Sequence, residues 1–155
     1  MADPLFTRVA IIGFGLIGSS LGRAIRAHGL CRTLVACDAS ADARHTIVRL
    51  ALADEVTGDP ATAAGGADLV VLAVPLGAYA AVAEAIAPVL RHDAIVSDVG
   101  SVKGLVVRDL PPLLPPHVHL VPGHPIAGTE NSGPESGFAA LFEGRWFILT
   151  PPPGT

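Results

Sequence analysis

The sequence has little charge, a single lysine, two cysteines and no long apolar run. Only 15% of its 155 residues are charged, and the formal net charge is −4. Without a basic tract, the sequence does not favour nucleic acid or an anionic membrane surface as a partner. No apolar stretch reaches a membrane-spanning length and the first residues lack a signal-peptide pattern, so we expect a cytoplasmic protein. Cys31 and Cys37 lack the spacing of a zinc or redox pair, and the histidines and carboxylates predict no metal site.

A glycine-rich stretch follows the first apolar run, at residues 9–20. The pattern is typical of a strand, a tight turn and a helix whose N-terminus faces a phosphate. Gly13 permits the sharp turn, Gly15 leaves room for a pyrophosphate, and Gly18 lets the helix pack against the strand. We therefore expect a dinucleotide cofactor to contact Gly13, Phe14, Gly15, Leu16, Ile17 and Gly18.

An aspartate ends the second predicted strand, which covers residues 33–37. Asp38 lies about 20 residues after the last glycine, where an acidic side chain can bind the ribose hydroxyls of the cofactor. A carboxylate there would repel the 2′-phosphate of NADP, and no arginine follows directly, so NAD is favoured. The alternative is that Asp38 only caps the next helix or occupies a turn.

Six short strands alternate with helices, which predicts one α/β domain over residues 1–155. We expect a doubly wound, mostly parallel Rossmann-type sheet with helices on both faces. The predicted strands are residues 8–12, 33–37, 67–74, 94–98, 118–121 and 145–149. The predicted helices are residues 16–28, 40–52, 76–90, 102–110 and a short one between 132 and 144, with a structureless loop at 122–133 before it.

In such a sheet the ligand lies outside the carboxyl ends of the strands. The segments expected there are residues 13–18, 73–77, 99–104 and 123–129. From them, Ala73, Val74, Pro75 and Gly100 join the predicted cofactor contacts.

Two of these segments carry polar groups suited to catalysis. His124 stands between Gly123 and Pro125 directly after a strand, and its imidazole can accept a proton near neutral pH. The alternative is a histidine that only braces its loop. Ser101 offers a hydroxyl to a substrate or to His124, or it only caps the helix that follows. Lys103 lies in the first turn of that helix, where a cation indicates either an anionic neighbour or plain solvent exposure.

Three motifs together resemble the prephenate dehydrogenase family, which includes cyclohexadienyl and arogenate dehydrogenases. They are GFGLIG at residues 13–18, VGSVKG at 99–104 and GHPIAGTE at 123–130. The resemblance implies NAD-dependent oxidative decarboxylation of prephenate or arogenate in tyrosine biosynthesis. It also implies that His124 takes a proton from the ring hydroxyl, that Ser101 orients that hydroxyl, and that Thr129 and Glu130, with Lys103, line the substrate site.

The resemblance covers only the N-terminal half of a family enzyme. The helical domain through which the family forms homodimers is missing, as is an arginine that binds the substrate carboxylates. We therefore expect the 155-residue chain to bind NAD but to turn over poorly. Two other functions stay open at this point, another β-hydroxyacid-type dehydrogenase and a non-catalytic dinucleotide-binding or regulatory module.

Overall fold

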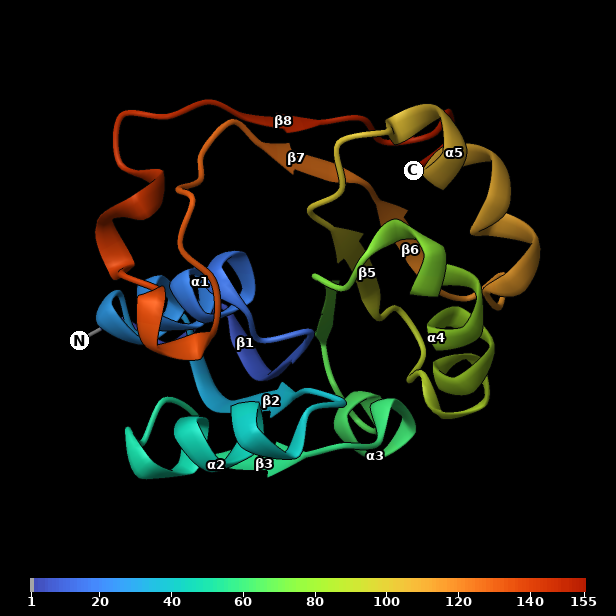
Figure 1. The fold of residues 1–155 in the computed structure, drawn as a ribbon. Coiled ribbons are helices and arrows are strands. Elements are labelled where there is room, and N and C mark those ends of the chain that lie inside the picture. Colours follow the sequence, from blue (N-terminus) through green and yellow to red (C-terminus); the bar gives the residue numbers. More distant parts are fainter. Residues whose placement is uncertain (1) are drawn as a thin grey trace.

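A six-stranded parallel sheet forms the centre of the computed structural model, which describes residues 2–155 (Figure 1). Its strand order is β3-β2-β1-β4-β5-β6. This is the order of a Rossmann fold, so the predicted α/β class and parallel doubly wound sheet are confirmed. The strands are β1 (Phe6–Ile12), β2 (Cys31–Cys37), β3 (Glu55–Thr57), β4 (Leu69–Leu72), β5 (Ile95–Asp98) and β6 (His119–Val121).

Helices cover both faces of the sheet because its central strands are apolar on both sides. In β1, Val9 and Ile11 belong to the core under α1 and α2, while Ala10 and Ile12 belong to the core under α3, α4 and α5. All four side chains are buried, as the unbroken apolar run predicts. The helices are α1 (Leu16–Ala27), α2 (Ala41–Arg49), α3 (Pro60–Ala64), α4 (Tyr79–Ile86) and α5 (Lys103–Asp109). Short 3-10 turns are η1 (Leu76–Ala78), η2 (Ala87–Val89) and η3 (Pro111–Leu113).

One of the six strands predicted for the main sheet lies elsewhere, and one strand of that sheet was not predicted. The sequence analysis missed β3, whose Glu-Val-Thr sequence is short and contains only one strongly apolar residue. Residues 145–149, predicted as the sixth strand, instead contain β8 (Phe147–Leu149), which lies outside the main sheet and is exposed. Its partner is β7 (Gly123–Pro125), within the loop predicted to be structureless. The two strands pair antiparallel, with His124 opposite Ile148.

The predicted short helix between residues 132 and 144 is also wrong. The segment contains two 3-10 turns, η4 (Pro134–Ser136) and η5 (Ala139–Phe142). No side chain caps η4, and Gly133 before it has a φ of +88°, which turns the chain away from a helical start. Side chains of α1 hold the segment instead. Arg23 Nη1 donates to the Pro134 carbonyl at 2.8 Å, and Ser20 Oγ accepts from the Phe138 N–H at 3.1 Å.

Candidate active site

The glycine-rich turn lies between β1 and α1, at the carboxyl end of the sheet. Gly13 has a φ of +92°, and a Cβ there would lie 2.5 Å from the Ala73 carbonyl oxygen. A Cβ on Gly18 would collide with the Gly13 carbonyl oxygen, whereas a Cβ on Gly15 would meet no atom within 4 Å. The three glycines therefore differ, because Gly13 and Gly18 are required by the fold and Gly15 borders open space.

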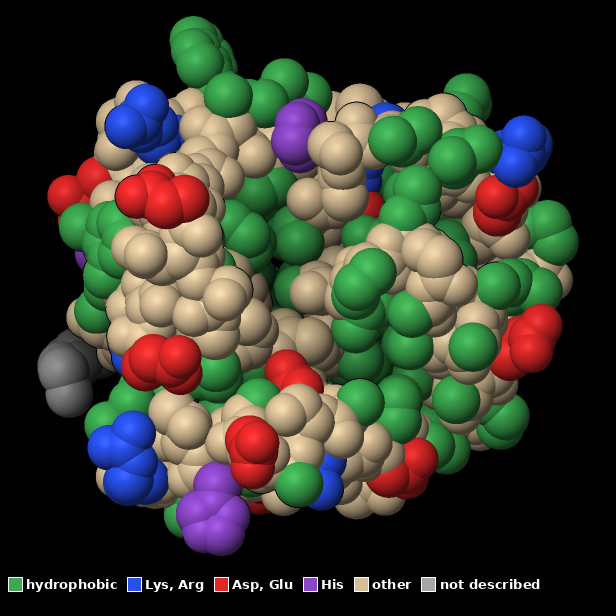
Figure 2. All heavy atoms as spheres, in the orientation of Figure 1, with side chains coloured by type: hydrophobic (Ala, Val, Ile, Leu, Met, Phe, Trp, Pro, Cys, Tyr) green, Lys and Arg blue, Asp and Glu red, His purple; other side chains and the backbone are tan. Residues whose placement is uncertain are grey.

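That open space belongs to a cavity of about 270 Å³ at the switch point between β1 and β4. Figure 2 shows the molecule in the orientation of Figure 1, with a hollow near the centre of the visible face and hydrophobic side chains within it. The cavity is lined by Gly13, Gly15, Asp38, Ala39, Ala73, Val74 and Pro75. A Rossmann fold binds dinucleotides at this point, so the residues present fit an NAD-type cofactor.

The other residues predicted to contact the cofactor differ in how much of their side chains is exposed. The Phe14 side chain is fully buried, and its ring packs so close to Gly22 that a Cβ there would lie 2.8 Å from Cζ. Phe14 therefore presents no exposed surface to a ligand, and its N–H donates to Asp38. Leu16 and Ile17 are half-buried in the first turn of α1.

Asp38 braces the glycine-rich turn rather than capping a helix. Its Oδ2 accepts from the Phe14 N–H at 3.0 Å and its Oδ1 accepts from the Ser40 N–H at 2.9 Å. Ser40 is the residue that caps α2, because its hydroxyl accepts from the Ala43 N–H. Arg44 also reaches this point, where Nη1 donates to the carbonyl oxygens of Asp38 and Ala39 at 2.8 and 3.0 Å. This cation was not predicted because it lies six residues beyond Asp38.

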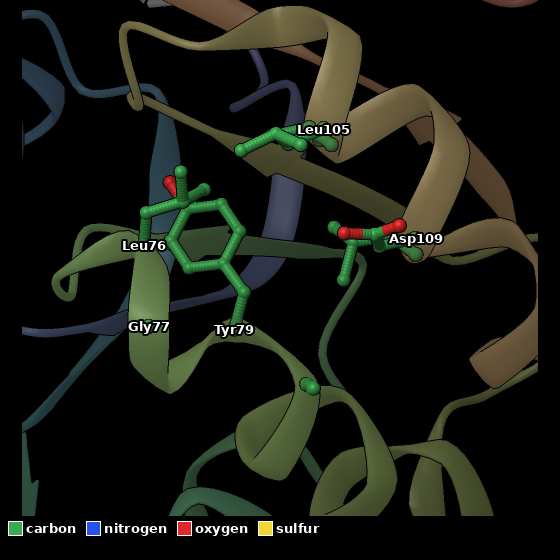
Figure 3. Close-up of a pocket in the computed structure, with 8 residues that line it drawn as sticks. Leu76, Gly77, Tyr79, Leu105 and Asp109 are labelled. Atoms are coloured by element: carbon green, nitrogen blue, oxygen red, sulfur yellow. The ribbon is translucent and has the colours of Figure 1, made fainter.

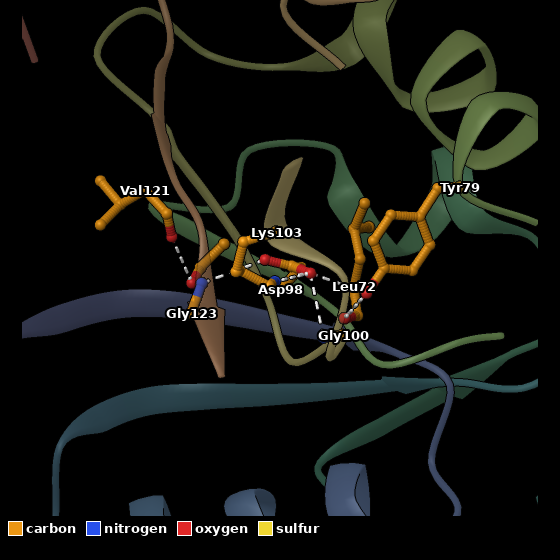
Figure 4. A network of polar contacts seen from close by, with 8 residues as sticks. Leu72, Tyr79, Asp98, Gly100, Lys103, Val121 and Gly123 are labelled. Carbon is orange, nitrogen blue, oxygen red and sulfur yellow. Dashed lines mark hydrogen bonds and ion pairs between the residues drawn. The ribbon is translucent and has the colours of Figure 1, made fainter. Parts of the chain in front are cut away.

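A second polar centre is formed around Asp98, the last residue of β5 (Figure 4). Asp98 is fully buried. Its Oδ2 accepts from the Tyr79 hydroxyl at 2.9 Å and from the Gly100 N–H at 3.0 Å, and it pairs with the Lys103 ammonium. Its Oδ1 accepts from the Gly123 N–H at 3.1 Å. The anionic neighbour of Lys103 is therefore Asp98, a residue to which the sequence analysis gave no role although it is a carboxylate ending an apolar strand.

Tyr79 connects this centre to a neighbouring cleft of about 340 Å³ between α4 and α5 (Figure 3). Its ring lines the cleft beside Leu76, and Leu105 and Asp109 lie on the opposite wall. Burial and the nearby Asp98 carboxylate raise the pKa of the Tyr79 hydroxyl well above its ordinary value. The hydroxyl therefore stays protonated and acts as a hydrogen-bond donor to Asp98.

His124 lies in β7, directly after the glycine that Asp98 holds. Its Nδ1 is buried and has no hydrogen-bond partner among the residues that the structure describes. A buried polar atom without a partner is unusual in a folded protein and is explained by a bound water, an ion, a ligand or a functional role; Arg8 Nε and Thr150 Oγ1 are buried without a partner as well. The ring thus offers a nitrogen that nothing in residues 2–155 satisfies.

Ser101 follows Gly100 at the start of the loop before α5 and is exposed. The helix begins at Lys103 without a side-chain cap, so the alternative that Ser101 caps it is wrong. Within the described part of the chain, the Ser101 hydroxyl makes no hydrogen bond, to His124 or to any other group. It remains available to a ligand.

Thr129 and Glu130 lie in the exposed loop that follows β7. Thr129 Oγ1 accepts from the Asn131 N–H at 3.1 Å. Across residues 2–155, no group of three or more His, Cys, Asp or Glu side chains is arranged to hold a metal ion. In the same range, no helix combines the length and the apolar composition needed to cross a membrane.

Comparison with known proteins shows which enzyme family the chain resembles in sequence and in structure. The family described as "Prephenate dehydrogenase, nucleotide-binding domain" matches residues 21–155. A cyclohexadienyl dehydrogenase of Zymomonas mobilis is 48% identical over 147 residues, which is 95% of this chain and 50% of that protein.

Solved structures give the same result. The prephenate dehydrogenase of Aquifex aeolicus, crystallised with hydroxyphenyl propionate and NAD+, superposes with a TM-score of 0.87 at 35% identity, over 96% of this chain and 52% of that one. A Synechocystis arogenate dehydrogenase gives a TM-score of 0.85 at 28% identity, over 95% and 51%. The chain spans about half the length of these relatives. With a family match that extends over most of its length, the chain belongs to the prephenate dehydrogenase family and forms its nucleotide-binding domain.

Proposed function

We propose that the protein oxidises prephenate or arogenate with NAD, with loss of carbon dioxide, and that His124 and Ser101 are its catalytic residues. One observation carries the proposal. The buried, unpartnered Nδ1 of His124 lies in a strand that Asp98 holds, and the same carboxylate holds the loop of Ser101. A base and a hydroxyl tied to one buried anchor are the groups that a dehydrogenase needs besides its cofactor.

Several features of the proposed cofactor site support NAD. The open space at Gly15 suits a pyrophosphate next to the N-terminus of α1, which is twelve residues long. Asp38 suits the ribose hydroxyls, and residues 73–75 line the same cavity on the β4 side. Bound there, NAD would supply the hydride acceptor.

The reaction balances with the groups at hand. As the hydride leaves C4 of the substrate ring, His124 takes the proton of the C4 hydroxyl, which Ser101 orients through a hydrogen bond. The bond between C1 and its carboxylate breaks and carbon dioxide leaves. The electron pair of that bond enters the ring, which becomes aromatic as the C4 oxygen takes the proton back from His124. The protein therefore contributes a base and a positioning hydroxyl.

Further substrate contacts are proposed from the loop after β7. Thr129 and Glu130 are exposed there and would border the substrate. Lys103 has its ammonium on Asp98, so a direct contact with a substrate carboxylate would compete with that ion pair. Homodimer formation through a helical domain, as the family resemblance implies, stays a prediction.

The test is to incubate the purified protein with NAD and either prephenate or arogenate, and to measure reduced nicotinamide and carbon dioxide together. The proposal expects the two products in equal amounts. Reduced nicotinamide without carbon dioxide would indicate another hydride-transfer enzyme. Cofactor binding without turnover by the protein as the cell makes it would indicate a non-catalytic module.

A further inference from the structure

Asp98 joins the two proposed catalytic segments through its two carboxylate oxygens. Oδ2 accepts the N–H of Gly100, the residue before Ser101, and Oδ1 accepts the N–H of Gly123, the residue before His124. We propose that Asp98 is a positioning residue, which fixes both backbones so that Ser101 and His124 face the same substrate. This inference rests on the function proposed above.

The strand of His124 needs such an anchor because it does not belong to the main sheet. Its only strand partner in the described residues is β8, whose Phe147, Ile148 and Leu149 are all exposed. The bond from Gly123 to Asp98 connects β7 directly to the end of β5. One residue earlier in β5, Ser97 Oγ donates to the Val121 carbonyl at 2.7 Å. This bond holds the end of β6, just before the chain enters β7. The end of β5 therefore sets where His124 lies relative to the sheet.

Neither glycine could carry a side chain without a close contact. A Cβ on Gly100 would lie 3.0 Å from Asp98 Oδ2 and 2.8 Å from the Tyr79 hydroxyl, so its absence leaves room for the carboxylate itself. A Cβ on Gly123 would lie 2.6 Å from Phe147 Cε1 and 3.0 Å from the Asp98 carbonyl oxygen, so its absence lets β7 lie against the backbone at the end of β5.

Lys103 and Tyr79 lower the free-energy cost of burying the Asp98 carboxylate. An ionised carboxylate removed from water is costly unless it is paired and hydrogen-bonded. The Lys103 ammonium supplies the opposite charge and the Tyr79 hydroxyl supplies a further donor. Four donors converge on two oxygens, so Asp98 has a requirement that a neutral side chain cannot meet.

Asp98→Asn would break this arrangement in a specific way. An asparagine has one acceptor oxygen and one donor NH2 group. The oxygen is expected to stay on the side of Oδ2, where three donors meet, which turns the NH2 group toward the Gly123 N–H. Two donors then face each other, so the variant should release β7 and His124 while it keeps the Ser101 side in place.

The experiment compares wild type, Asp98→Asn and the matched control Asp68→Asn by NMR on 15N-labelled protein. Asp68 also accepts two backbone N–H groups, from Thr7 at 2.6 Å and Arg8 at 2.9 Å, and also pairs with an arginine, Arg91. We expect the Gly123 amide and the His124 ring signals to shift, and Gly123 hydrogen exchange to accelerate, only in Asp98→Asn. Unchanged Gly123 and His124 signals in a folded Asp98→Asn protein would overturn the inference.

Wild type offers a second test should Asp98→Asn fail to fold. A coupling through the hydrogen bond, between the Gly123 amide nitrogen and the Asp98 carboxylate carbon, is expected. Its absence would contradict the anchor directly. Because neither NMR measurement requires turnover, failure of this inference is distinguishable from failure of prephenate oxidation.

Steady-state kinetics distinguish a positioning role of Asp98 from a contribution to stability alone. With substrate, Asp98→Asn should lower kcat on the order of 10²-fold, the typical cost of displacing a catalytic group by about 1 Å, while KM for NAD changes little. Asp68→Asn should retain kcat. Equal losses of kcat in both variants would show that Asp98 contributes stability only.

Discussion

Gly15 and Gly18 provide a paired test of the cofactor site, because the structure assigns the two glycines different roles. Gly15→Ala adds a methyl group that meets no protein atom within 4 Å, but Gly15 has a φ of −75° with a ψ of −148°, outside the regions that L residues favour. Its folding cost therefore combines the poorer N-cap of α1, up to about 1 kcal/mol, with a backbone strain of about 1–3 kcal/mol. The methyl group enters the space assigned to the pyrophosphate, so the Kd for NAD should rise at least about tenfold, or about 1.4 kcal/mol.

Gly18→Ala should lower the stability of the fold more than it weakens NAD binding. Its Cβ would collide with the Gly13 carbonyl oxygen and lie 3.2 Å from Ile11 Cγ2, both in the packed turn. Overpacking of this kind costs about 1–3 kcal/mol, which lowers Tm by roughly 2–12 °C for a domain of this size. Calorimetric titration with NAD and thermal unfolding without it separate the two effects. If Gly15→Ala binds NAD as wild type does, the pyrophosphate does not lie at this turn.

Two further substitutions and the ionisation of Cys37 test other parts of the account. Asp38→Ser removes the carboxylate that opposes a 2′-phosphate and leaves the Arg44 guanidinium beside it, so the ratio of NADP to NAD affinity should rise about tenfold or more in binding titrations. Gly123→Ala places a Cβ 2.6 Å from Phe147 Cε1 next to His124, so kcat should fall by about 10- to 100-fold with NAD binding retained. Burial raises the pKa of the Cys37 thiol from 9.0 to about 11 and also raises the pKa of the Cys31 thiol. Because Cys37 is buried and Cys31 is partly exposed, iodoacetamide should modify Cys31 first at pH 8. Because the pKa of Cys37 is higher in the folded state, the contribution of its thiol to stability is complete below about pH 9 and is lost toward pH 11, as denaturant unfolding would show.

The sequence predicted the central sheet well because its strands are buried on both faces. Residues such as Val9 and Ile11 leave a continuous apolar run that no other element explains, and the glycine spacing then defines the turn. β3 was missed for the opposite reason, since an edge strand of three residues carries neither an apolar run nor a clear alternation.

The segment after β6 was the least predictable part of the chain. β7 consists of Gly123, His124 and Pro125, three residues that no local preference assigns to a strand. It exists because β8 pairs with it from 24 residues away and because Asp98 holds its first N–H. Such pairings depend on tertiary contacts, which a single sequence does not encode locally.

The candidate site was predicted by its segments but not by its connections. The glycine-rich turn and Ser101 follow the carboxyl ends of β1 and β5, as predicted, whereas His124 lies in β7, shortly after the end of β6. The anchoring carboxylate was not foreseen, because nothing in the spacing of Asp98 shows that two distant glycines donate to it. The sequence likewise did not show that Lys103 is already paired.

Replacement of His124 by asparagine tests the central claim most directly. The matched control is His119→Asn, at an exposed position on β6 where Nε2 lies 3.4 Å from an Asp93 carboxylate oxygen. In the complete protein, with prephenate or arogenate and NAD and with reduced nicotinamide followed by its absorbance, His124→Asn should lower kcat by roughly 10² to 10⁴, the usual contribution of a general base. KM for NAD should change little, and His119→Asn should match wild type. A His124→Asn protein with wild-type kcat would contradict the account.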